Sequence, residues 1–285
     1  MRLSGSIRRA DVVALDRAHV WPPYTSSERH ESSEPLVIVA ADGPWIEDAD
    51  GRRYLDGNAS WWACTLGHGH PRLRAALAAQ AEALMHVSAG GITHAPMALL
   101  ARELAEVTPG DLNRVHFSDD GSTAVEVAVK AAFQYWQQNG RPSRVRFLAL
   151  SGAYHGDTLG AASLAGIDEF RSVFDPILFD VIRPPPLREV GGWERVFSRV
   201  LDELRRRPDE IAGVVVEPLV QGAAGMQVYD AALLRALREA TSEIDTFLIA
   251  DEVFTGYGRT GSMWACERAG VAPDLLCMAK GFTAG

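Results

Sequence analysis

Apolar strands that alternate with amphipathic helices constrain the fold of this chain more than any other feature of its sequence. The continuous apolar runs at 211–216 and 246–250 have the composition of strands that are covered on both faces of a sheet. The segment at 194–207 instead repeats its apolar residues with a helical period. Strands and helices in alternation predict an α/β fold with a mostly parallel sheet and helices on both faces.

Further elements are expected around these three. They are helices at 72–86, 95–107, 123–138 and 231–242, and strands at 114–118 and 144–150.

The first sixty residues have a different character. Residues 1–35 are expected to form an irregular arm, because Trp21-Pro22-Pro23-Tyr24 disfavours helix and pairs poorly as a strand. Residues 36–56 predict a small antiparallel sheet with a turn at Asp50-Gly51. We therefore expect an N-terminal arm with small-domain strands at 1–60 and a large domain at 61–285.

The composition of the chain limits the classes of partner that it is expected to bind. A formal net charge of −9 and a pI near 5.4 disfavour nucleic acid and anionic membranes, whose phosphates would repel the chain on average. The three cysteines lack the close Cys or His pairing of a zinc site, so we expect no metal. Reduced cysteines, no signal-peptide pattern and no long apolar run predict a cytoplasmic protein.

Asp251 and Lys280 each follow an apolar run near the end of the chain. Catalytic side chains of α/β sheets lie at the carboxyl ends of the strands, so these two groups are expected to meet above the sheet. A carboxylate and a desolvated amine suit pyridoxal 5'-phosphate, because its ring nitrogen needs an acid and its aldehyde forms a Schiff base with lysine.

A phosphate site is expected in the loop from Ser118 to Thr123, where a strand is followed by a helix whose first N–H groups would be available beside a serine hydroxyl. A plain helix cap by Asp120 or Ser122 is the alternative. Tyr154 and His155 follow another strand, and an aromatic ring there can stack on a cofactor. An exposed Tyr-His turn remains open as the second interpretation.

The segment Gly256 to Gly261 matches the G-x-G-x-x-G pattern of dinucleotide-binding proteins. Asp251 and Glu252 stand directly before it and would repel a pyrophosphate, and Gly270 with Pro273 leaves little room for the long helix that such a site requires. A glycine turn that brings the chain back beside Asp251 is the preferred interpretation.

The segment from Asp251 to Gly261, followed by Lys280, resembles the class III aminotransferases of PLP fold type I. The resemblance runs from about Asp16 to Gly285. Three further stretches resemble the branch of that family that aminates 8-amino-7-oxononanoate with S-adenosyl-L-methionine in biotin biosynthesis. They are Trp21 to Ser26, Ser60 to Pro71 and Gly90 to Pro96. Phe254 and Thr123 stand where other branches often carry Gln and Glu.

The resemblance implies roles for particular residues. Lys280 would be the Schiff-base lysine, Asp251 the partner of the ring nitrogen, and Gly121 and Ser122 the phosphate site. Tyr154 and His155 would lie near the cofactor, and the substrate residues would be Tyr24, Trp61, Tyr154, Asp157 and Arg259. The resemblance also implies a homodimer with its active site at the interface.

Two departures from the family pattern are visible, Pro22 in place of a histidine and Asp120 in place of a serine. Family members also continue well beyond the position of Gly285, so we expect this chain to be truncated at its C-terminus and its activity alone to be low. Two alternatives remain open: a class III transaminase with another amino donor, and a non-catalytic remnant of the fold that serves dimerisation.

Overall fold

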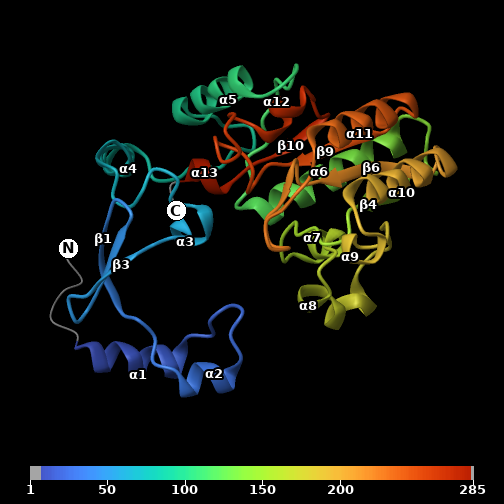
Figure 1. Ribbon diagram of the computed structural model, residues 1–285. Coiled ribbons are helices and arrows are strands. Elements are labelled where there is room, and N and C mark those ends of the chain that lie inside the picture. The colour runs from blue at the N-terminus through green and yellow to red at the C-terminus, as the bar shows by residue number, and fades with distance from the viewer. Residues whose placement is uncertain (1–7, 284–285) are drawn as a thin grey trace. The chain divides into compact units, whose positions relative to one another are not determined.

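The computed structural model describes residues 8–283 in two compact units (Figure 1). The N-terminal unit lies within Met1–Met85 and the sheet unit within His86–Thr283. The domain boundary expected at residue 60 stays a prediction.

A five-stranded sheet organises the sheet unit. Its strands are β4 (Arg146–Ala149), β5 (Val181–Ile182), β6 (Ile211–Val216), β9 (Phe247–Asp251) and β10 (Leu275–Cys277). They pair in the order β10-β9-β6-β4-β5, and every pair is parallel. Parallel strands need crossovers, and helices supply most of them, so the α/β prediction is confirmed.

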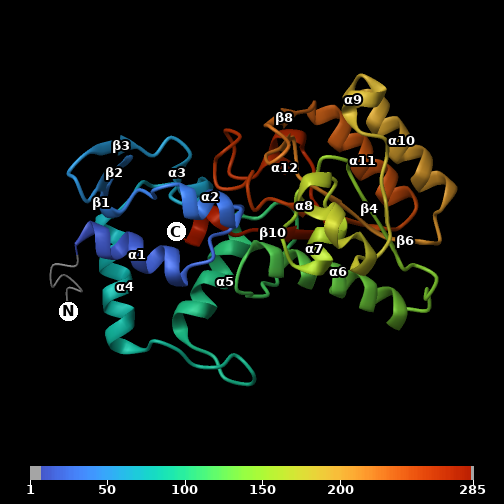
Figure 2. The same ribbon diagram turned by 90° about the horizontal axis from the view of Figure 1, so that it is seen from below.

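Helices lie on both faces of the sheet (Figure 2). Apolar side chains form one buried layer on each face. Side chains alternate along β9, so Leu248 packs with one layer and Ile249 with the other. The first layer comes from α10 (Trp193–Arg206), α11 (Ala231–Glu243) and α12 (Ala265–Ala269), and the second from α6 (Gly121–Gln138) and α7 (Leu159–Leu164). Each fully buried leucine or valine stabilises the unit by roughly 1.5–3 kcal/mol relative to exposure.

The remaining elements of the sheet unit are short, apart from α5. They are α5 (Ala95–Val107), α8 (Asp168–Arg171), η1 (Ser172–Ile177), α9 (Leu187–Val190), β7 (Val220–Gln221), β8 (Gln227–Val228) and α13 (Lys280–Thr283).

The strand expected at 114–118 is wrong. This stretch forms no ladder within residues 8–283, although it follows α5 as expected. A strand needs a hydrogen-bonded neighbour, and the sheet edge at β10 pairs only with β9 in the described part of the chain.

The N-terminal unit holds the predicted antiparallel sheet, with β1 (Ile38–Asp42), β2 (Trp45–Asp48) and β3 (Arg53–Leu55) in that order. Two further helices are α3 (Ala59–Trp62) and α4 (Pro71–Ala83).

The expectation of an irregular arm is wrong for two segments, which form α1 (Arg9–His19) and α2 (Ser27–Ser32). Asp11 in the first turn of α1 and Arg17 in its last turn have charges that match the helix dipole. These charges favour a helix before the proline pair, which itself disfavours helix only where it stands. The stretch between the helices, around Trp21 to Tyr24, and the residues from Ser33 to Pro35 are irregular as predicted.

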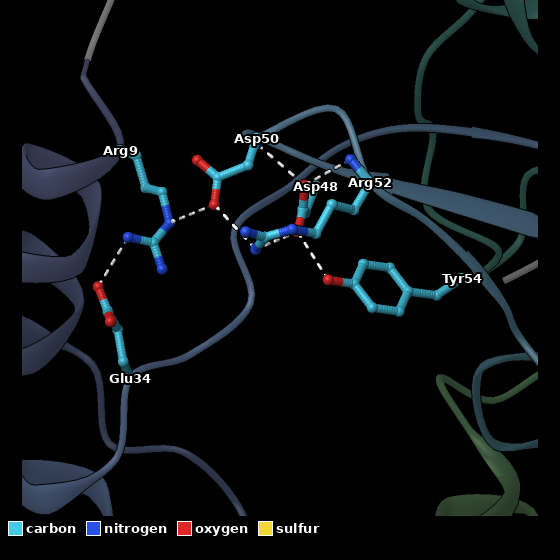
Figure 3. Close-up of polar contacts among 6 residues, drawn as sticks. All are labelled: Arg9, Glu34, Asp48, Asp50, Arg52 and Tyr54. Carbon is cyan, nitrogen blue, oxygen red and sulfur yellow. Dashed lines mark hydrogen bonds and ion pairs between the residues drawn. The ribbon is translucent and has the colours of Figure 1, made fainter.

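Figure 3 shows how the β2–β3 turn is held. Asp48 is buried and accepts hydrogen bonds from the N–H groups of Asp50 and Arg52, both at 2.9 Å, and from the Tyr54 hydroxyl at 2.8 Å. Burial acts to raise the Asp48 pKa, but these hydrogen bonds outweigh it, and the pKa is lowered. Arg9 of α1 lies 3.7 Å from Asp50, which ties the helix to this turn.

Among residues 8–283, no helix is both long enough and apolar enough to cross a membrane.

Candidate active site

Polar side chains gather at the carboxyl ends of the strands in the sheet unit. Asp251 ends β9, Glu217 follows β6, and Lys280 begins α13 shortly after β10. The loop after β4 brings Tyr154 and His155 to the same edge. Parallel strands deliver their carboxyl ends to one edge, so residues far apart in the sequence meet there.

Asp251 is buried and paired with His155. His155 Nδ1 lies 2.6 Å from Asp251 Oδ2, and the Val253 N–H donates to Asp251 Oδ1 at 3.1 Å. His155 is also buried, and its Nε2 has no hydrogen-bond partner among the described residues. A carboxylate fixed in this way remains able to accept a further hydrogen bond from a cationic ring.

Lys280 is partly buried, and burial lowers the pKa of its amine. The negative charges of Asp251 and Glu217 oppose that shift, whereas the positive charge of Arg259 adds to it. The Lys280 amine is therefore close enough to these three charged side chains for each to affect its pKa. A lowered pKa raises the fraction of neutral amine, the form that attacks a carbonyl carbon.

The N-terminus of α6 lies close to residues that neighbour Asp251 and Lys280 in the sequence. A side chain at Gly121 would lie 2.8 Å from Val253 and 3.5 Å from Ala279, so only glycine allows this approach. Asp120 caps the helix and accepts the Thr123 N–H at 2.8 Å. The cap and the predicted phosphate site therefore coexist, because the first-turn N–H groups of Gly121 and Ser122 have no partner within the helix.

Ser122 joins this helix start to the loop after β4. Its Oγ accepts the Asp157 N–H at 3.3 Å, and a side chain at Gly156 would collide with it. The Tyr154 hydroxyl donates to Asp157 Oδ2 at 2.8 Å. The structure thus brings together the expected site residues of this unit, which are Gly121, Ser122, Tyr154, His155, Asp157, Asp251 and Lys280.

Glu217 is a site residue that the sequence analysis missed. Its carboxylate accepts the Tyr154 N–H at 3.0 Å and the Gly222 N–H at 2.9 Å. Complete burial raises its pKa to about 7, His155 opposes this shift, and Asp251 adds to it. The signal was present in the sequence, since Glu217 follows the apolar run at 211–216 as Asp251 follows the run at 246–250.

The glycine-rich segment is a turn, as preferred. The Glu252 carboxylate is buried and accepts the N–H groups of Ala265 at 3.0 Å and Cys266 at 2.8 Å, which folds the segment back on itself. The helix that follows, α12, has only 5 residues. Arg259 lies in this turn and stacks over the Phe254 ring at 5.2 Å.

Tyr24 and Trp61 belong to the N-terminal unit, where their rings meet edge to face at 5.4 Å. Trp61 lies in α3, whose residues have positive φ angles that non-glycine residues rarely adopt. Their assignment to the substrate, like those of Asp157 and Arg259, stays a prediction.

The residues of the sheet unit fit pyridoxal phosphate. A buried carboxylate, a lysine with a lowered pKa and the start of an 18-residue helix form one edge. Gly121 and Gly156 both stand where a side chain would collide with a neighbour, so the backbone there is closely apposed to the helix start. Ring nitrogen, aldehyde and phosphate each find a group of suitable chemistry.

Comparisons with known proteins agree with this chemistry. A family model described as aminotransferase class-III matches residues 26–285. The adenosylmethionine-8-amino-7-oxononanoate aminotransferase of Geobacter sulfurreducens is 46% identical over 280 residues, which cover 95% of this chain and 62% of that protein.

Two solved structures have the same fold. The crystal structure of adenosylmethionine-8-amino-7-oxononanoate aminotransferase from Methanocaldococcus jannaschii gives a TM-score of 0.91 at 33% identity, covering 98% of this chain and 64% of that one. An (S)-enantioselective omega-transaminase from Thermomicrobium roseum gives 0.91 at 36% identity, with the same coverage of 98% and 64%. This chain therefore spans less than two thirds of the length of these relatives.

Proposed function

The chain belongs to the class III aminotransferase family, whose cofactor is pyridoxal phosphate, and from that premise we propose that it transfers amino groups between small molecules. One observation carries the proposal: the start of α6, Asp251 and Lys280 converge at one edge of the sheet. When bound, the cofactor serves as an electron sink for the bond that is broken at the amino carbon.

Different residues of the chain would bind the ring nitrogen, bind the phosphate and move the proton. Asp251 would stabilise a positive charge at the ring nitrogen, and its hydrogen bond with His155 keeps the carboxylate in place. The N–H groups of Gly121 and Ser122 would bind the phosphate at the helix start. Lys280 would take up and release a proton at its amine, a role that its lowered pKa favours.

We further propose S-adenosyl-L-methionine as the amino donor and 8-amino-7-oxononanoate as the acceptor. The names of the relatives support this choice, as do the sequence stretches around Trp21, Trp61 and Gly90. A second candidate is a transaminase with another amine donor, because the omega-transaminase structure matches with the same TM-score of 0.91. We also infer a cytoplasmic homodimer, on the strength of the family resemblance.

Borohydride reduction tests the cofactor site. The sequence contains two lysines, Lys280 and the exposed Lys130, so the second is a matched control. After incubation with pyridoxal phosphate and reduction, mass spectrometry should find the pyridoxyl group on the Lys280 peptide. Lys280→Ala should lose the label and Lys130→Ala should keep it. Equal labelling of the two lysines would contradict the proposal and favour a non-catalytic remnant.

The donor is tested by a half-reaction. The chain loaded with cofactor is mixed with S-adenosyl-L-methionine, lysine, ornithine or alanine, and the visible spectrum is followed. A change with S-adenosyl-L-methionine alone supports the proposed donor. A change with another amine but not with S-adenosyl-L-methionine supports the second candidate.

A further inference from the structure

Three side chains of the N-terminal unit are arranged as a nucleophile, a base and an orienting acid. Cys64 Sγ lies 3.6 Å from His68 Nδ1, and His68 Nε2 lies 2.8 Å from Asp56 Oδ2. A carboxylate at Nε2 holds the ring proton on that side, which leaves Nδ1 to accept the thiol proton. A nucleophile in reach of a base that a third group orients is the usual signature of an activated nucleophile.

The base and the acid are anchored to the same hairpin turn. His68 exchanges both backbone hydrogen bonds with Gly43, at 2.8 and 3.0 Å, and the Asp56 N–H donates to the Pro44 carbonyl at 2.9 Å. A side chain at Gly67 would lie 3.1 Å from the Gly43 carbonyl oxygen, so glycine is needed for this approach. The geometry of the group is therefore set by backbone contacts as well as by its side chains.

Asp56 has the charge that the arrangement requires. Hydrogen bonds from the Ser60 backbone, from His68 and from the Ser60 hydroxyl lower the Asp56 pKa, so the carboxylate is ionised at neutral pH. The Asp56 and His68 side chains are only 9% and 16% exposed, which limits screening between them. Because Cys64 and Asp56 face opposite ring nitrogens of His68, the three cannot share one metal ion.

The other two cysteines have a different environment. Cys266 and Cys277 are buried, and burial raises the pKa of both thiols. Cys64 is half-buried, so a small reagent has access to it that the other two thiols lack.

We propose that Cys64 is an activated thiol and a site of covalent modification by soft electrophiles, with His68 as its base and Asp56 as the positioning residue. In the reaction with an alkyl halide, His68 Nδ1 takes the thiol proton. The sulfur then forms a bond to the halide-bearing carbon, and the halide leaves with the electron pair of the broken bond.

Iodoacetamide labelling followed by mass spectrometry tests the proposal. At about pH 6 an ordinary thiol is almost entirely protonated, so its alkylation is slow. We expect Cys64 to react about tenfold faster in the folded chain than in the same chain unfolded by urea, allowing for the lower nucleophilicity of a stabilised thiolate. Cys266 and Cys277 should react more slowly when folded. A Cys64 rate that is equal or slower in the folded chain would overturn the proposal, whatever the behaviour of any variant.

Variants separate activation from simple exposure. His68→Gln removes the base and should abolish the excess rate, while circular dichroism checks the fold. Asp56→Asn should move the pH dependence of labelling toward the alkaline range of an ordinary thiol. Ser60→Ala removes another hydrogen bond to the same carboxylate oxygen, at 2.8 Å, and should leave the pH dependence nearly unchanged. An unchanged rate in folded His68→Gln would also refute the activation.

Discussion

Glu217 holds the loop that carries Tyr154 and His155, and it does so at an electrostatic cost. Two N–H groups donate to its two oxygens, which favours the ionised carboxylate, while complete burial favours the protonated acid. The balance leaves its pKa at about 7. Its charge also opposes the lowering of the Lys280 pKa by burial, so the protonation of one group influences the other.

This balance predicts a pH dependence of stability. The pKa of Glu217 rises from 4.5 in the unfolded chain to about 7 in the folded one, so the folded state binds the proton more tightly. The stability contributed by that proton is complete below about pH 4.5 and is lost as the pH rises through about 7, with a total on the order of 3 kcal/mol.

Urea unfolding at several pH values measures the pH-dependent stability that Glu217 contributes. In Glu217→Gln the free energy of unfolding should fall less between about pH 5 and pH 8 than in the unchanged chain, because an amide does not titrate there. Parallel pH curves for the two proteins would show that Glu217 does not titrate in this range.

Helix α6 is the element on which the proposed phosphate site depends. Its capping box pairs Asp120 with the N–H of Thr123 and the Thr123 hydroxyl with the backbone of Asp120, which fixes the first turn beside Val253 and Ala279. A helix start without this cap would fray at the residues expected to bind phosphate.

Removing the cap should cost stability. Asp120→Ala is expected to lower the free energy of unfolding by about 1 kcal/mol and to weaken cofactor binding. Asp119→Ala removes the same charge from an exposed neighbour and is the matched control. Thermal denaturation measures the first effect and a cofactor titration the second. Equal losses in both variants would attribute the change to charge alone.

A substitution in helix α11 can test the packing of the first apolar layer. Leu237 is fully buried within that layer, so Leu237→Ala should lower the free energy of unfolding by about 2–5 kcal/mol. Leu99→Ala on α5 truncates a side chain that is 48% exposed, and it should cost clearly less. Urea unfolding followed by circular dichroism compares them, and similar losses would contradict the assignment of Leu237 to the core.

At the scale of the whole molecule, the proposed homodimer gives a direct prediction. Light scattering at micromolar concentration should report twice the chain mass of 30.9 kDa. The exposed apolar residues of α5, such as Leu99 and Val107, are consistent with a surface that another chain covers. A mass of one chain across the concentration range would contradict the dimer for this polypeptide.

The sequence by itself determined the class of fold and indicated two residues of the proposed site. Continuous apolar strands at 211–216 and 246–250 and the period of 194–207 are local patterns, so the parallel sheet with helices on both faces could be predicted from them. Asp251 and Lys280 could be found for the same reason, since each follows such a strand.

Tertiary structure decided what depends on contacts between distant segments. The stretch at 114–118, which was predicted as a strand and forms none, shows that such a stretch becomes a strand only where a neighbouring segment offers backbone hydrogen bonds. The contact of His155 with Asp251 and the hydrogen bond between Glu217 and Tyr154 likewise join segments that no local pattern connects. The same holds for the contacts of His68 with Cys64 and Asp56, which form across turns and strands. Burial and pairing set how each of these groups ionises, and both exist only once the chain has folded.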